Sequence, residues 1–134
     1  MQVREFMTSI LVTSDASTRV SEAAKLMAAE DIGSLVITKG DTMVGIVTRR
    51  DLISSHLLSP EAYEDLRVED IMTSHVVSVS PEADLWQAIS LMDKTGKKHI
   101  PVVADDQTIG IITATDLIRV LATMKLIAGG ASDD

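Results

Sequence analysis

Residues 45–53 read GIVTRRDLI, and residues 110–118 read GIITATDLI. In both stretches a glycine stands three residues before a threonine, and the threonine stands three residues before an aspartate. Apolar residues precede each threonine and follow each aspartate, which is the pattern of a strand that passes directly into a helix. We refer to this stretch as the signature. Its recurrence indicates that the chain contains an internal repeat.

The repeat extends well beyond the signature. A shift of 65 positions aligns residues 6–53 with residues 71–118 without a gap, and about 14 of the 48 aligned pairs are identical. The period exceeds that of solenoid repeats, so two copies of a small subdomain that close on each other are favoured. We expect the first repeat at residues 1–58, an acidic linker at 59–70, the second repeat at 71–126 and a disordered tail at 127–134.

Each copy predicts the element order β-α-β-β-α, and hence an α+β fold. Strands are expected at residues 10–13, 34–38 and 43–48, and at residues 76–79, 99–103 and 108–113. A helix follows the first strand of each copy, because apolar residues recur there at helical spacing. These residues are Val20, Ala23, Ala24 and Met27 in the first copy and Leu85, Ala88, Ile89 and Met92 in the second.

Composition restricts the class of protein. The 134 residues suffice for one compact body, and with one Trp, one Tyr and one Phe its core is aliphatic. A net charge of −8 disfavours nucleic-acid binding. The absence of cysteine excludes disulfides, thiolate catalysis and cysteine-ligated zinc. No signal peptide and no run of 18 apolar residues is present, which predicts a soluble, cytoplasmic protein without a membrane partner.

The threonine and aspartate of the signature have two interpretations. In the first, Thr48 with Asp51 and Thr113 with Asp116 are capping boxes that begin a helix, and Gly45 and Gly110 allow a strand to pass close to its neighbour. In the second, the helix start offers free amides to an anion while the aspartate accepts hydrogen bonds from a vicinal diol such as a ribose. Spacing alone leaves both open.

A resemblance to a known family favours the second interpretation. The paired Met-Thr openings (Met7-Thr8 and Met72-Thr73), the second strands GSLVI and HIPVV, and the signature resemble the CBS domain, named after cystathionine β-synthase, in its tandem form, the Bateman module. The similarity spans roughly residues 3–125. It implies two β-α-β-β-α repeats packed as a pseudo-two-fold pair. It also implies a regulatory module that binds an adenosyl ligand, AMP, ADP, ATP or S-adenosylmethionine, in clefts between the repeats and relays its presence to an effector protein.

The resemblance also implies which residues bind the nucleotide. The aspartates would hold the ribose hydroxyls with support from the threonines, and adenine would lie against the first strand and the start of the second. Charged or polar residues that differ between the copies would reach the phosphates, unless they are merely solvated surface groups. The full set is Thr13, Gly33, Ser34, Thr48, Arg50 and Asp51 in the first copy and Ser78, Lys98, His99, Ile100, Thr113, Thr115 and Asp116 in the second.

Other features argue against catalysis. The three histidines lack the spacing of a metal site, and no nucleophile motif or Walker loop occurs, so we expect neither an enzyme nor a catalytic cofactor. Trp86 is either an interface anchor or a partly buried core residue. Apolar helices suggest a homodimer formed through helices, as in the family. The alternative to a ligand sensor is a ligand-free interaction scaffold.

Overall fold

The computed structural model describes residues 1–129, and these form two compact units of mixed α and β structure. One unit is Leu11–Val76. The other combines Met1–Ile10 with the chain from Val77 onward. The expected α+β class is confirmed, and residues 130–134 of the expected tail lie outside the described residues.

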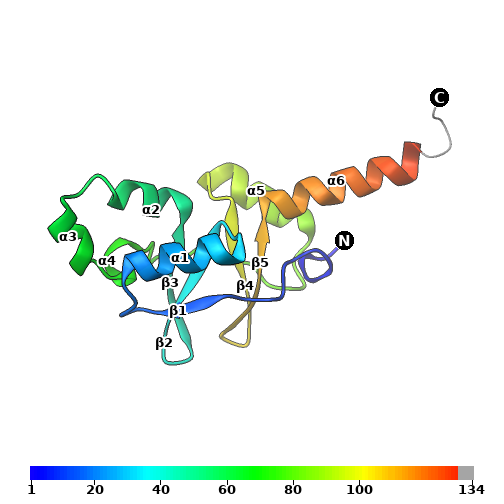
Figure 1. Cartoon of the computed structure of the whole chain (residues 1–134). Helices are drawn as coiled ribbons and strands as arrows, with labels where there is room; N and C mark the ends of the chain where they lie inside the picture. The colour runs from blue at the N-terminus through cyan, green and yellow to red at the C-terminus, as the bar shows by residue number, and fades with distance from the viewer. Residues whose placement is uncertain (130–134) are drawn as a thin grey trace. The chain divides into compact units, whose positions relative to one another are not determined.

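The unit Leu11–Val76 contains the first β-α-β-β-α copy. Its elements are β1 (Thr13–Asp15), α1 (Val20–Glu30), β2 (Ser34–Lys39), β3 (Thr42–Thr48) and α2 (Arg49–Ser55). The strands form a sheet in the order β1-β2-β3, with β1 parallel and β3 antiparallel to β2. Helix α1 packs on this sheet (Figure 1) through Val20, Ala23 and Met27, which confirms the predicted apolar stripe.

The segment that follows α2 is not an open linker. Residues 59–70 contain α3 (Pro60–Asp65) and the first residues of α4 (Val68–Ile71). Ser59 caps α3 by accepting a hydrogen bond from the Ala62 N–H at 3.3 Å, and Pro60 stands in the first turn, where its missing N–H is harmless. Val68 is fully buried in the core of this unit, so the segment is part of the fold.

The second unit contains η1 (Val3–Glu5), α5 (Leu85–Thr95), β4 (His99–Ala104), β5 (Gln107–Thr113) and α6 (Ala114–Gly129). Its first strand, expected at residues 76–79, is reduced to a single bridge between Val79 and Val102. The physical reason is Pro101. In the first copy the Val36 N–H donates to the Val12 carbonyl at 3.4 Å, whereas its counterpart Pro101 has no N–H to donate.

The compact units and the sequence repeats have different boundaries. Thr8 exchanges two backbone hydrogen bonds with Ile111, at 2.8 and 2.9 Å, and Thr73 does the same with Ile46, at 3.0 and 2.9 Å. Each Met-Thr segment therefore pairs with the last strand of the repeat to which it does not belong in sequence. The first ten residues of the chain consequently fold with the second copy.

The bounds of one strand and two helices differ slightly from those expected. The first strand lies at 13–15 rather than 10–13, α2 ends at Ser55, and α6 continues to Gly129, beyond the expected end of the second repeat at residue 126. Within residues 1–129, no helix is both long enough and apolar enough to cross a membrane. A cytoplasmic location stays a prediction.

Candidate functional site: two strand-to-helix junctions

The first signature places Asp51 at the junction of β3 and α2. Thr48 has an extended backbone (φ −113°, ψ 170°) and ends the strand, and the helix begins at Arg49. Oδ2 of Asp51 accepts hydrogen bonds from the Thr48 backbone N–H at 2.8 Å and from the Thr48 hydroxyl at 3.2 Å. Asp51 is half-buried, and its Oδ1 accepts no hydrogen bond from residues 1–129. One carboxylate oxygen is therefore available to an incoming donor.

The second signature forms a complete capping box. The Thr113 N–H donates to Oδ2 of Asp116 at 2.9 Å, and the Asp116 N–H donates to the Thr113 hydroxyl at 3.1 Å. The capping geometry predicted from the sequence is thus confirmed. Here, however, Oδ1 also has partners: it accepts from the Thr8 hydroxyl at 3.4 Å and from Nη1 of Arg119 at 3.3 Å. Asp116 is only 5% exposed.

The start of each second strand lies beside its signature. Ser34 pairs with Thr48 across the sheet, and the Arg49 N–H donates to the Gly33 carbonyl at 3.2 Å. In the second unit His99 pairs with Thr113, and the Ala114 N–H donates to the Lys98 carbonyl at 3.0 Å. The structure therefore brings the second-strand residues of each implied set against the threonine of the same copy.

The remaining implied residues lie at varying distances from the junctions. Thr13 pairs with Val36, two residues along β2 from Ser34, and Ser78 precedes the Val79 bridge. The side chain of Ile100 is fully buried in the core, so only its backbone is available to a ligand. Of the implied residues within the signatures or directly before a second strand, Arg50, Lys98 and Thr115 have exposed side chains.

The glycines of the signature make room for the Met-Thr segments. A Cβ added to Gly45 would stand 2.8 Å from the Thr73 carbonyl oxygen and against the sulfur of Met72. A Cβ added to Gly110 would stand 2.8 Å from the Thr8 carbonyl oxygen and 2.7 Å from the sulfur of Met7. Close backbone approach accounts for both glycines without any ligand.

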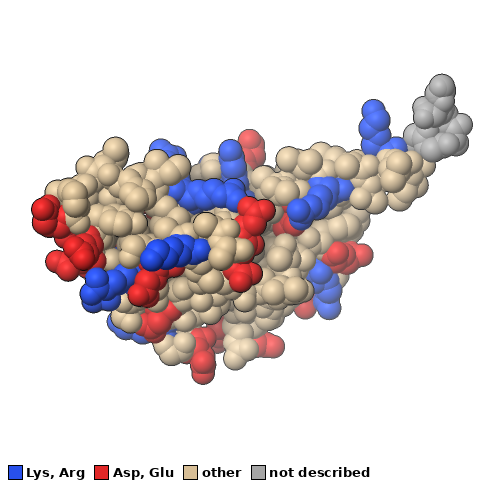
Figure 2. All heavy atoms as spheres, viewed as in Figure 1, with Lys and Arg blue, Asp and Glu red and all other residues tan. Residues whose placement is uncertain are grey.

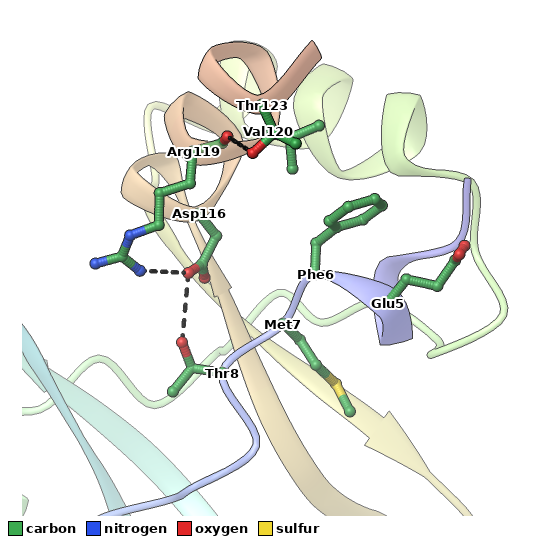
Figure 3. Close-up of a pocket in the computed structure, with 8 residues that line it drawn as sticks. All are labelled: Glu5, Phe6, Met7, Thr8, Asp116, Arg119, Val120 and Thr123. Atoms are coloured by element: carbon green, nitrogen blue, oxygen red, sulfur yellow. Dashed lines mark hydrogen bonds and ion pairs between the residues drawn. The ribbon is translucent and has the colours of Figure 1, made fainter. Parts of the chain in front are cut away.

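A pocket of about 320 Å³ adjoins the second junction (Figure 3). Phe6 from the N-terminal segment points toward α6, and the carboxylate of Asp116 and the guanidinium of Arg119 stand at one side. The lining residues are Glu5, Phe6, Met7, Thr8, Asp116, Arg119, Val120 and Thr123.

Sequence reasoning did not identify Thr8 and Arg119 as site residues. Thr8 had a signal in the repeated Met-Thr pair. The signal for Arg119 was a difference between the two copies, since Ser54 occupies the equivalent position of the first copy. Among residues 1–129, no group of three or more potential metal ligands is placed to hold an ion.

Comparison with known proteins identifies the repeat. The family model for the CBS domain matches the chain twice, at residues 3–57 and 68–123. The chain is 31% identical over 105 residues to the mitochondrial CBS domain-containing protein CBSX3 of Arabidopsis thaliana, covering 75% of this chain and 51% of that protein. It is 32% identical over 117 residues to inosine-5'-monophosphate dehydrogenase of Korarchaeum cryptofilum, covering 87% of this chain and 23% of that enzyme.

The chain spans about half the length of the curated relatives that it matches first. Among solved structures, that of CBSX2 in complex with AMP is similar over 92% of this chain and 98% of the other, with a TM-score of 0.81 and 27% identity. The fold, the doubled signature and these matches agree: the chain belongs to the CBS domain family and carries two copies of the domain.

Proposed function

We propose that this protein is a regulatory module that binds an adenine nucleotide, AMP, ADP or ATP, through its two signatures. The observation that carries the proposal is the carboxylate of Asp51, which stands at a strand-to-helix junction with one oxygen satisfied and the other available. A vicinal diol supplies the donors that such a carboxylate lacks. The AMP complex of the similar protein CBSX2 supports the choice of an adenosine ligand.

In this proposal each group of the ligand has a partner. The ribose hydroxyls donate to Asp51 or Asp116, with Thr48 or Thr113 beside them. Phosphate oxygens accept from Arg50 in the first copy and from Lys98 and Thr115 in the second, all of which are exposed. Adenine lies along the second strands, near Gly33 and Ser34 or His99 and the Ile100 backbone, with Thr13 and Ser78 on the adjoining strands.

The ligand would act by shifting a population of conformations. Helices α2 and α6 begin at the two signatures, so contacts to the aspartates bear directly on the first turn of each helix. A ligand that binds one arrangement of these helices better than another favours that arrangement, and a partner protein reads the difference. The proposal includes no chemical step.

We further propose that the module forms a homodimer through its helices. Large apolar side chains are exposed on α6, where Ile118 and Leu121 are both 64% exposed and Leu126 is 76% exposed. The outer part of α6 is predominantly uncharged on the face that Figure 2 shows. Trp86 is 69% exposed and therefore not a core residue, which supports its assignment to this interface in the proposal.

The capping boxes also support one alternative function. In it the protein is a ligand-free interaction scaffold, and the threonine and aspartate of each signature serve only to cap a helix. A thermal-shift screen of AMP, ADP, ATP, S-adenosylmethionine and guanosine separates the two. At 100 times its dissociation constant, a ligand adds about 2.7 kcal/mol to the free energy of unfolding, or roughly 8 °C in a domain of this size.

The screen is run on the parent and on the Asp51→Ala, Asp116→Ala double variant. Asp70→Ala is the matched control, because Asp70 caps α4 by accepting from the Arg67 N–H at 2.8 Å but lies outside both signatures. We expect adenine nucleotides to stabilise the parent and the control but not the double variant. If no ligand stabilises the parent, the scaffold function replaces this proposal. A shift with S-adenosylmethionine alone would name that ligand instead.

A further inference from the structure

The two signature aspartates differ in the hydrogen-bond partners of Oδ1, the carboxylate oxygen that takes no part in the capping box. Oδ1 of Asp116 is held by Thr8 and Arg119, while Oδ1 of Asp51 has no partner among residues 1–129. Figure 3 shows the guanidinium and the hydroxyl pointing toward the same oxygen. Position 54, the counterpart of Arg119 in the first copy, is a serine. The arginine contact is therefore absent from the first copy because of a substitution, and Thr73, the counterpart of Thr8, makes no hydrogen bond to Asp51.

The contacts to Oδ1 of Asp116 are long. At 3.3 and 3.4 Å both exceed the usual range for their type of hydrogen bond, so an incoming donor can displace them readily. A buried carboxylate nevertheless needs a compensating charge, and Asp116 is 5% exposed while Arg119 is 73% exposed. Arg119 is thus the solvent-exposed member of the pair, and it lines the 320 Å³ pocket.

We propose that Arg119 determines the ligand specificity of the second signature by moving from Asp116 to the phosphate of a bound nucleotide. This inference rests on the proposed function. When the ribose hydroxyls take Oδ1 of Asp116, the guanidinium loses its partner. A phosphate within reach of Arg119 replaces the carboxylate as its anionic partner. The phosphate oxygens can accept two parallel hydrogen bonds from the guanidinium, which is the bidentate geometry that this group prefers.

Ligands without a phosphate gain nothing from this exchange. A neutral adenosine derivative must break the contact between Arg119 and Asp116 without replacing it, and a cationic sulfonium is repelled by the released guanidinium. The second signature therefore selects adenosyl ligands that carry a phosphate. The first signature lacks the arginine and needs no such exchange, so its selectivity is set by other groups.

Calorimetric titration with AMP and with 5'-methylthioadenosine tests the inference. The two ligands share adenine and the ribose diol, and only AMP carries a phosphate. The full chain with Asp51→Ala isolates the second signature. We expect AMP to bind this variant at least tenfold more tightly than 5'-methylthioadenosine, which is the usual effect of a hydrogen bond to a charged group. Adding Arg119→Met should bring the two affinities within about threefold.

Two further variants in the same background complete the test. Lys125→Met removes one positive charge from the same helix outside the pocket and should leave the affinity ratio unchanged. Arg119→Lys keeps the charge and should restore part of the preference for AMP. An unchanged ratio in Arg119→Met overturns the inference. The inference is also overturned if the parent binds AMP but the Asp51→Ala variant binds neither ligand. In that case the proposed function still holds, with Asp51 as the binding residue. If the parent binds neither ligand, both proposals fall.

Discussion

The hydroxyl of Thr8 lies 3.4 Å from Oδ1 of Asp116, although 108 residues separate them along the chain. The contact exists because the backbone of Thr8 pairs with Ile111 on β5, two residues before Thr113 of the second signature. The N-terminal Met-Thr segment is thereby part of the site at the junction of β5 and α6. A residue of the first sequence repeat thus contributes to the fold of the second copy.

Replacing Thr8 by valine tests the energetic value of this contact. Thr8→Val keeps the shape of the side chain and removes the donor, while Arg119 still holds the carboxylate. We expect the free energy of unfolding to fall by about 1 kcal/mol or less, because the hydrogen bond is long and partly exposed. Urea denaturation measures it, with Thr73→Val as the matched control in the other Met-Thr segment. A loss well above 2 kcal/mol would show a structural role beyond this bond.

The signature glycines should tolerate no side chain. Gly45→Ala and Gly110→Ala each place a Cβ against a backbone carbonyl oxygen that cannot move without breaking strand pairing. We expect each substitution to lower the free energy of unfolding by about 1–3 kcal/mol. Urea denaturation gives the size of the effect, and adding Met72→Ala to Gly45→Ala should restore little, because the Thr73 oxygen remains. Wild-type stability for both alanine variants would contradict the close approach.

The exposed apolar face of α6 predicts self-association. Leu121→Glu should convert a dimer to a monomer without lowering the stability of the fold, because this side chain is 64% exposed. Sedimentation velocity over a range of concentrations measures the change. Lys125→Gln, which makes the same one-unit change in charge on the same helix, is the control and should leave the dimer in place. A parent protein that sediments as a monomer throughout would remove this prediction.

Acid stability should depend on Ser17. The side chain and the backbone N–H of Ser17 both donate to Asp15, and these hydrogen bonds lower the pKa of the Asp15 carboxyl in the folded protein. A depressed pKa in the folded state stabilises the fold above the unfolded-state pKa, and this contribution is lost as the pH falls through the folded-state pKa. Ser17→Ala should raise the pKa of Asp15 in an NMR titration. An unchanged value would show that other groups cause the shift.

Local patterns were sufficient to predict most of the fold. The strands at 34–39, 42–48, 99–104 and 107–113 and the buried faces of α1 and α5 agree with the alternation and spacing of apolar residues. The prediction of a strand at residues 76–79 was wrong. Pro101 on the partner strand has no N–H to donate, and the apolar pattern of residues 76–79 does not reveal this. The burial of Val68 at the end of the expected linker depends on residues distant in sequence, which local patterns do not reveal.

Local patterns, including the repeated signature, therefore predicted the element order, the family and the position of both capping aspartates, since each depends on residues a few positions apart. The exchange of the Met-Thr segments, the crowding at Gly45 and Gly110 and the contact of Thr8 with Asp116 depend on residues distant in sequence. Spacing cannot encode such contacts. They arise only when strand pairing places Thr8 against Ile111 on β5 and Thr73 against Ile46 on β3.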